Sequence, residues 1–171
     1  FEDPNVPHSE NSIDPVRDME LVDLELQVRD LDLVTRKMQR VEKLLKNGEK
    51  DNKRCYEVLG VYKEVLENMG NARDAKVDEE DRKYVQDLQL LTAKPLIFVC
   101  NVDDASATTG NRCSDAVKAA LKEGQDMLVI AGKLEAEIAE LDADDRLMFM
   151  EDAGLKEPGV NKLVRTAYHT L

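Results

Sequence analysis

The segment from Pro95 to Asp104, PLIFVCNVDD, decides the fold class of this chain. Its first six residues form a short apolar run with β-branched and aromatic side chains, which is typical of a buried β-strand. The run stops at Asn101, and two carboxylates, Asp103 and Asp104, follow closely. A simple polar turn would explain this pattern. A ligand would explain it too, because open parallel sheets bind ligands beyond the carboxyl ends of their strands.

A second buried strand follows further along the chain. The run DMLVIAG at 126–132 is again apolar, and residues 112–123 between the two runs have the pattern of an amphipathic helix. A strand, a helix and a strand so close together predict a βαβ unit, with parallel strands at 96–100 and 127–131. Helices that suit packing against a sheet are then predicted at 133–140, 142–152 and 159–170.

The first half of the chain predicts a long helical hairpin. Asp14 and Pro15 make a good helix start, and this helix is expected to run to Asn47-Gly48. A second helix is predicted at 51–69, with Gly70 as its terminator, and a short acidic helix near 78–88. The apolar positions of both long helices repeat in heptads, which predicts an antiparallel coiled coil. These positions are Leu24, Leu31, Val34, Met38, Val41, Leu45, Cys55, Leu59, Tyr62, Leu66 and Met69.

Composition narrows the classes of function. Charged residues make up 35% of the chain and aromatics 4%, and the net charge is −12, which favours long solvated helices and argues against nucleic-acid binding over the whole surface. The tip of the predicted hairpin is nevertheless basic, with eight cations against three anions, which predicts contact with the phosphates of RNA or the ribosome. An ordinary solvated helix surface is the alternative. The cations are Arg36, Lys37, Arg40, Lys43, Lys46, Lys50, Lys53 and Arg54.

Several other sites are disfavoured. The three cysteines show no Cys-x-x-Cys spacing and are odd in number, which predicts reduced thiols in a cytoplasmic protein. No apolar run approaches the ~20 residues that span a bilayer, and there is no signal peptide, so no membrane partner is expected. His8 and His169 lie near opposite ends, which gives little support to a catalytic triad or a histidine metal site. We therefore assign no catalytic and no metal-binding residues.

The polar residues after the two strands form a candidate nucleotide-base pocket. An Asn amide can donate to and accept from a base edge, a carboxylate can accept two hydrogen bonds, and small residues let backbone amides approach a ring closely. A polar turn is the alternative. The six candidate residues are Asn101, Val102, Asp104, Ala131, Gly132 and Lys133.

Several segments together resemble the YchF family, the Obg-like ATPases, which belong to the translation-factor-related P-loop nucleotidases. They are FED at the start, DMELVDLELQVRDLD, CNVDD, KLEAEIAEL and the ending EPGVNKLVRTAYHTL. The resemblance implies an α/β fold: part of a parallel-sheet P-loop G domain with an inserted long antiparallel α-helical hairpin. It assigns residues 1–14 to an incoming loop of the G domain, 15–90 to the helical coiled-coil insertion and 91–171 to the carboxyl-terminal part of the G domain. It further implies binding of ATP in preference to GTP, and association with ribosomes.

The chain also departs from the family pattern. No G-x-x-x-x-G-K-[ST] occurs in its 171 residues, so we expect a central portion of such a protein that is inactive alone, with the Mg²⁺ ligands outside it. Asp104 stands where the family has Glu, and Ala131-Gly132-Lys133 stands where Ser-Ala-Lys is usual. GTPases have Asn-Lys-x-Asp, so Asp104 favours guanine while Val102 departs from that motif. The resemblance itself favours ATP.

These observations lead to one main hypothesis. The chain is expected to be part of a monomeric, ribosome-associated ATP- or GTP-binding hydrolase, in which it supplies the base pocket and a basic hairpin for ribosome or RNA contact. The alternative is a helical interaction module without enzymatic activity that binds RNA or protein through its hairpin.

Overall fold

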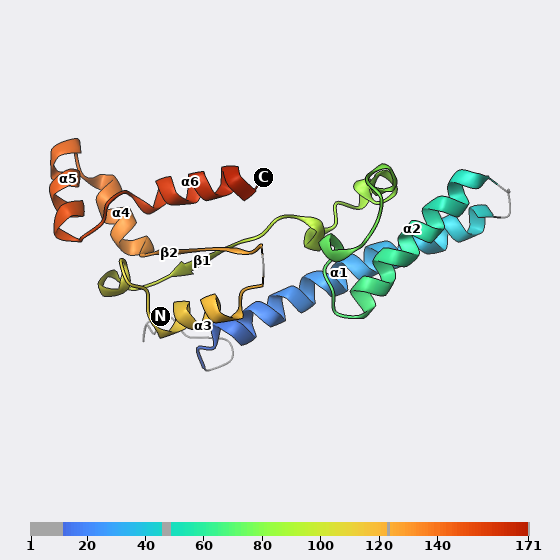
Figure 1. Cartoon of the computed structure of the whole chain (residues 1–171), viewed down its shortest axis with the longest axis horizontal. Coiled ribbons are helices and arrows are strands. Elements are labelled where there is room, and N and C mark those ends of the chain that lie inside the picture. Colours follow the sequence, from blue (N-terminus) through green and yellow to red (C-terminus); the bar gives the residue numbers. More distant parts are fainter. Residues whose placement is uncertain (1–11, 46–48, 123, 171) are drawn as a thin grey trace. The chain divides into compact units, whose positions relative to one another are not determined.

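The structure is a computed structural model that describes residues 12–45, 49–122 and 124–170 (Figure 1). It divides into two compact units. The hairpin unit comprises residues 19–94, and the α/β unit contains the described residues up to Asp18 together with those from Pro95 onward. Helix α1 (Pro15–Leu44) begins in the α/β unit and continues through the hairpin unit.

The hairpin unit is built on the apolar stripe between α1 and α2 (Lys50–Glu67), which lies alongside α1 in Figure 1. Val34 and Val41 of α1 are buried in one core with Leu59 and Tyr62 of α2. Because the heptad positions of both helices meet there, the predicted stripe is confirmed over this length. Cys55, Leu66 and Val58 complete the buried set of α2, and Leu31 and Met38 pack against it.

The predicted apolar stripe is wrong at the end of the hairpin that lies away from its tip. Leu24 is 38% exposed and Met69 is 69% exposed. Helix α2 has 18 residues against the 30 of α1 and ends near Gln27, whose side-chain amide donates to the Met69 carbonyl at 3.3 Å. Leu24 precedes that level on α1, so no residue of α2 is left to cover it.

The end of α2 differs from the expected glycine stop. Met69 adopts the left-handed conformation with φ of 59°, and its amide donates to the Leu66 carbonyl at 3.2 Å. The Gly70 amide then donates to the Val65 carbonyl at 2.9 Å, which completes a Schellman motif. Gly70 is needed for close approach, because a Cβ there would lie 2.9 Å from the Val65 carbonyl oxygen.

The segment after α2 consists of 3₁₀ turns. The acidic helix predicted near 78–88 is instead two 3₁₀ helices, η3 (Glu79–Tyr84) and η4 (Gln86–Leu88), and left-handed Gln89 ends the second. Two further turns, η2 and η5, lie on either side of this pair and cover residues 72–74 and 91–93. Side chains of the hairpin hold this segment in place, so its conformation is set by tertiary contacts rather than by local helix propensity.

The α/β unit contains the predicted parallel strands. β1 (Ile97–Asn101) pairs with β2 (Asp126–Ile130) in parallel, and Asn101 lies opposite Ile130. The predicted fold class is therefore confirmed, with each strand displaced by one residue from its predicted range. The helices of this unit, besides the first turn of α1, are α3 (Arg112–Ala120), α4 (Gly132–Glu140), α5 (Ala143–Asp152) and α6 (Gly159–Thr170).

Short polar side chains fix where these helices begin. Asn111 caps α3 by accepting from the Ser114 amide at 3.1 Å, and Asp142 caps α5 by accepting from the Asp145 amide at 3.1 Å. Helix α5 therefore begins one residue after the start at 142 that the sequence predicts. Helix α3 ends at Ala120, short of its predicted end.

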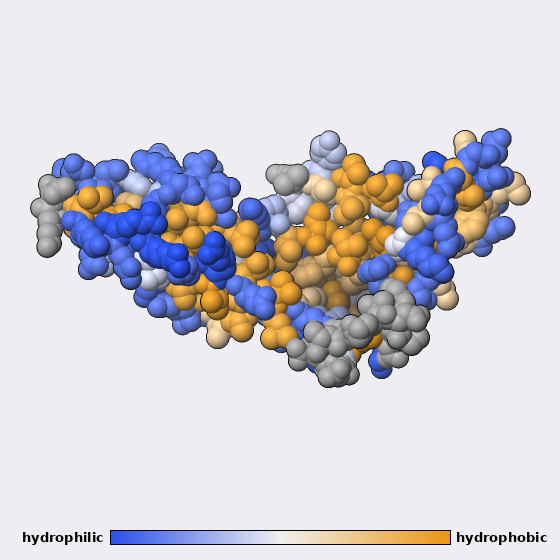
Figure 2. Space-filling view, turned by 180° about the vertical axis from the view of Figure 1, so that it is seen from behind, coloured by the Kyte–Doolittle hydropathy of each residue, from blue (hydrophilic) through white to orange (hydrophobic). Residues whose placement is uncertain are grey.

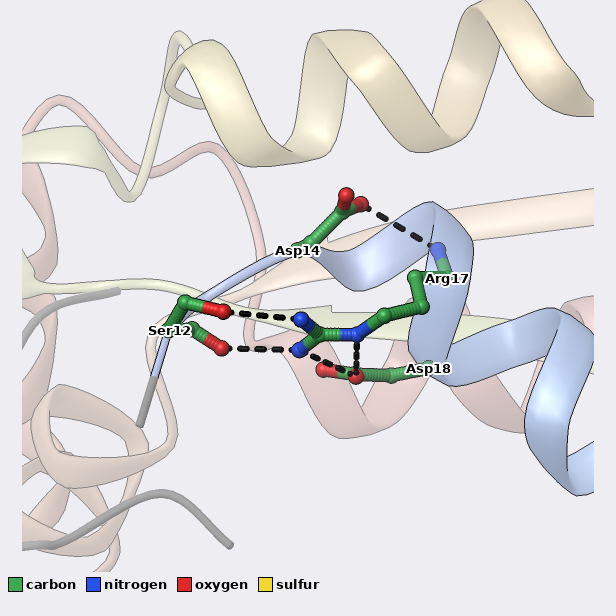
Figure 3. A network of polar contacts seen from close by, with 4 residues as sticks. All are labelled: Ser12, Asp14, Arg17 and Asp18. Atoms are coloured by element: carbon green, nitrogen blue, oxygen red, sulfur yellow. Dashed lines mark hydrogen bonds and ion pairs between the residues drawn. The ribbon is translucent and has the colours of Figure 1, made fainter. Parts of the chain in front are cut away.

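The predicted start of α1 is confirmed as well, and Figure 3 shows its contacts. Asp14 accepts from the Arg17 amide at 3.1 Å, and Pro15 is the first helical residue. The Arg17 guanidinium donates to the Ser12 hydroxyl at 2.7 Å and to the Asp18 carboxylate at 2.9 Å. These contacts fix the chain as it enters the helix.

The three cysteines, Cys55, Cys100 and Cys113, are free thiols. Burial raises the pKa of Cys55 and of Cys100.

Within residues 12–45, 49–122 and 124–170, no helix combines the length and the apolar character that a membrane-spanning helix needs.

Candidate functional site

The ends of the two strands are joined by one hydrogen bond. Asn101, the last residue of β1, accepts from the backbone amide of Gly132, the first residue of α4, at 2.9 Å through its side-chain oxygen. An N–H donor requires an acceptor, so this contact fixes the orientation of the Asn101 amide. Its oxygen lies against Gly132, and its NH₂ group keeps its donors for another partner.

Gly132 lies in close contact with the Asn101 side chain. A Cβ at this position would lie 3.1 Å from the Asn101 side-chain oxygen, which is tighter than an ordinary carbon–oxygen contact. Glycine therefore lets the start of α4 approach the end of β1. The predicted role of the small residues, to let backbone amides approach a base ring, stays a prediction.

The two carboxylates after β1 have different environments. Asp103 accepts from the Ser106 hydroxyl at 2.9 Å and from the Ser106 amide at 3.0 Å, and these hydrogen bonds lower the pKa of Asp103. Asp103 thus fixes the turn that follows the strand. Asp104 is 44% exposed at its side chain, and its carboxylate lies 3.8 Å from the Lys133 ammonium. At such exposure the ion pair is weak, and both groups remain available to a ligand.

The structure brings four of the six predicted base-pocket residues to one exposed polar edge: Asn101, Asp104, Gly132 and Lys133. Val102 and Ala131 are each 3% exposed and belong to the core beneath this edge, with Leu134 and Ile138 of α4. Their side chains pack the site rather than line it. We call the four exposed residues the strand-end edge.

Sequence reasoning missed one residue of this region. The contact of Ser106 with Asp103 was not anticipated, although the Asp-x-x-Ser spacing is a recognisable capping signal. Among the described residues, no group of three or more His, Cys, Asp or Glu side chains gathers as a metal site.

The predicted basic surface divides into paired and unpaired cations. Lys37 is 18% exposed at its side chain; its ammonium donates to the Tyr84 carbonyl at 2.7 Å and pairs with Asp87. Arg54 pairs with Asp81, the buried residue of η3, and this contact raises the pKa of Arg54. Both cations therefore hold the 3₁₀ segment against the hairpin.

The other cations of this basic surface make only surface ion pairs or none among the described residues. Arg36 pairs with Asp32 on the same helix at 2.9 Å, and Lys53 lies 3.9 Å from Glu57. Lys46 lies outside the described residues. The remaining three, Arg40, Lys43 and Lys50, are exposed, and within the described part of the chain none has an ion-pair partner. The view in Figure 2 shows hydrophilic residues over much of the hairpin near its tip.

The chain combines a parallel strand pair, which ends in a polar edge, with a helical hairpin. Its fold is therefore that of an α/β protein of the G-domain type with a helical insertion. No protein-family model matches the chain. A solved structure described as that of the Schizosaccharomyces pombe YchF GTPase matches the whole chain and 48% of its own, with a TM-score of 0.86 at 19% identity. That likeness establishes the fold alone.

Two sequence relatives carry the name YchF. The chain is 36% identical over its full length to the ribosome-binding ATPase YchF of Bacillus subtilis and 34% identical to that of Escherichia coli O157:H7. The predicted resemblance to the YchF family is therefore confirmed. The chain covers 48% and 47% of these two proteins, so it spans about half the length of the curated relatives it matches.

Proposed function

We propose that this chain forms part of a ribosome-associated, nucleotide-binding ATPase or GTPase of the YchF type. In this proposal the strand-end edge binds the purine base, and the hairpin tip contacts ribosomal RNA. The observation that carries it is the hydrogen bond between Asn101 and Gly132, because it joins two strand ends into one polar edge. That edge lies where open parallel sheets bind ligands.

The chemistry of the edge fits a purine base. The free NH₂ donors of Asn101 suit N7, an acceptor that adenine and guanine share. Asp104 and Lys133 offer an acceptor and a donor to the rest of the base edge. The 171 residues contain no phosphate-binding G-x-x-x-x-G-K-[ST] sequence, so a triphosphate and its Mg²⁺ would be held by residues outside this chain.

The proposed ribosome contact rests on the free cations of the hairpin tip and on the names of the relatives. Several YchF relatives are called ribosome-binding ATPases. Arg40, Lys43 and Lys50 are exposed, and no carboxylate neutralises them within the described residues. Cations of this kind bind RNA phosphates without reading base edges. A ribosomal partner would also place the protein in the cytoplasm.

The base pocket is tested by replacing Asn101. Asn101→Ala removes the donor for N7 and the oxygen that holds Gly132, so binding of both ATP and GTP should fall by about tenfold or more. Binding is measured by saturation-transfer NMR with each nucleotide in turn. Asn161→Ala, on the exposed face of α6, is the matched control and should bind as the unmodified chain does. Equal binding by Asn101→Ala and the unmodified chain would rule out the pocket and favour the interaction module.

A further inference from the structure

We infer that a cavity on the hairpin unit binds a long cationic side chain, arginine or lysine, from a basic segment of a partner protein. The cavity measures about 210 Å³ and lies between α2 and the segment from Lys76 to Asp81. Neither the proposed base pocket nor the proposed RNA contact uses it. Pockets that enclose drug-sized ligands measure ~300–1,000 Å³. This cavity is smaller, so one side chain fits it better than a whole small molecule.

Three valines form the apolar part of the cavity lining. Val58 of α2 is 3% exposed, and Val61, one turn further along the same face, is 36% exposed. Val77 comes from the segment after α2 and packs against the core of the hairpin unit. The aliphatic stem of an arginine or lysine buries well along such a surface while its charged head stays in water.

The polar part of the lining carries more carboxylates than its guanidinium can neutralise. Arg54 pairs with Asp81, and it lies 3.5 Å from Glu57 and 3.9 Å from Asp78. The Asp81 side chain makes the closest of the three contacts. Asp78 is 87% exposed at its side chain and has no other ion-pair partner within the described part of the chain. Its carboxylate is therefore available to a second cation.

The backbone around Asp78 fixes this carboxylate at the cavity. Asp78 directly precedes η3, and its carbonyl accepts from the Asp81 amide at 3.0 Å. The Asp78 side chain makes no capping hydrogen bond to η3. The turn thus holds the position of the residue and leaves its carboxylate oxygens for a ligand.

Lys76 lines the cavity as well and raises an anionic ligand as the competing occupant. It is exposed, and it has no ion-pair partner among the residues that the structure describes. The lining nevertheless has three carboxylates, Glu57, Asp78 and Asp81, against the two cations Arg54 and Lys76. Complementary charge therefore favours a cationic side chain over an anionic one.

The inference is tested by adding the peptide acetyl-Gly-Gly-Arg-Gly-Gly-amide to the 171-residue chain. The amide signals of Val61, Val77 and Asp78 should shift saturably in NMR spectra, with a Kd that is roughly millimolar. A peptide with citrulline in place of arginine keeps the shape of the side chain without its charge, so it should bind about fivefold more weakly. A peptide with glutamate at this position should not bind.

Two substitutions in the lining should change the affinity in opposite directions. Asp78→Asn removes the available carboxylate and should weaken binding of the arginine peptide about threefold to fivefold. Lys76→Gln removes a repelling charge and should strengthen binding about twofold. Glu80→Gln, an exposed acidic residue of η3 outside the cavity lining, is the matched control and should leave the affinity unchanged.

The opposite results would overturn the inference. Tighter binding of the glutamate peptide than of the arginine peptide would show that the cavity takes anions. Equal binding of the arginine and citrulline peptides, or no saturable shift with either, would show that it takes no cationic side chain. A loss of affinity in Glu80→Gln as large as that in Asp78→Asn would show that the peptide responds to net charge and not to the cavity.

Discussion

The Asp30 carboxylate accepts two hydrogen bonds from Thr92 through one oxygen in the interior of the hairpin unit. It accepts from the Thr92 amide and from the Thr92 hydroxyl, each at 2.7 Å, and both residues are fully buried. Its other oxygen accepts from the Leu91 amide at 2.9 Å. The Thr92 hydroxyl oxygen in turn accepts from the Ala72 amide at 2.8 Å. One carboxylate on α1 thus fixes two of the 3₁₀ turns that follow α2.

Removing this carboxylate should be strongly destabilising. Asp30→Ala leaves three donors without an acceptor, two of them on fully buried Thr92, and we expect the free energy of unfolding to fall by about 3–5 kcal/mol. Urea unfolding followed by circular dichroism measures the change. Asp32→Ala, two residues along the same helix, removes only the surface ion pairs with Arg29 and Arg36 and should cost less than about 1 kcal/mol. Equal losses in the two variants would show that the hydrogen bonds of Asp30 contribute no more to stability than the surface contacts of Asp32.

The stop of α2 predicts opposite effects at adjacent positions. Met69 is exposed and left-handed with φ of 59°, a conformation that costs an L-residue roughly 1–2 kcal/mol. Met69→Gly should therefore raise the free energy of unfolding by up to about 1 kcal/mol. Gly70→Ala should lower it, because the new Cβ would press against the Val65 carbonyl. Thermal unfolding of the two variants measures both effects. Destabilisation by Met69→Gly would contradict the left-handed conformation of Met69.

Local signals explain which elements could be predicted from the sequence. The two strands are apolar runs ended by polar residues, and each helix that begins at a capping Asp was found within a residue or two. The 3₁₀ segment was predicted as a helix because its acidic residues resemble a helix start. Its real conformation depends on contacts with Lys37 and Arg54, which are distant in sequence.

The same limit applies to the candidate sites. A count of charges places eight cations near the hairpin tip but cannot show that Lys37 is mostly buried and paired with Asp87. The pattern Asn-x-x-Asp predicted a polar strand end but not that the Asn101 oxygen is taken by Gly132. Which atoms stay free for a ligand depends on contacts between residues far apart in the chain.

The Tyr84 hydroxyl should titrate at unusually high pH. Its hydrogen bond to Asp51, helped by burial, raises the pKa of Tyr84 to about 12. Because the folded-state pKa lies above the ordinary value, this contact stabilises the fold fully below about pH 10. The stabilisation is lost as the pH rises toward the folded-state pKa.

Ultraviolet titration of tyrosinate, compared with Tyr84→Phe, isolates this group. Asp51→Ala should lower the pKa of Tyr84 toward the ordinary tyrosine value. Glu49→Ala is the matched control, since this nearby carboxylate bonds Asn52 rather than Tyr84 and its loss should leave the titration largely unchanged. An unchanged titration in Asp51→Ala would disprove the contact.

The free cations of the hairpin tip should carry the RNA contact. The variant with Arg40, Lys43 and Lys50 each changed to Gln removes three charges and no ion pair of the described residues. Each phosphate contact contributes roughly 0.7–0.9 to the slope of log affinity against log salt, so the slope should fall by about two to three. The loss should not depend on RNA sequence, because ammonium and guanidinium groups that meet phosphates read no bases.

Filter binding to ribosomes and to a structured ribosomal RNA fragment over a range of salt concentrations measures both quantities. The matched control changes Lys118, Lys122 and Lys156 to Gln, three exposed lysines of the α/β unit, and alters the net charge equally. Its salt slope should stay close to that of the unmodified chain, because loss of charge alone removes no bound phosphate. Circular dichroism confirms that both variants keep their helices. If the two triple variants lost affinity and slope equally, the hairpin tip would be an ordinary solvated surface, and binding would reflect net charge alone.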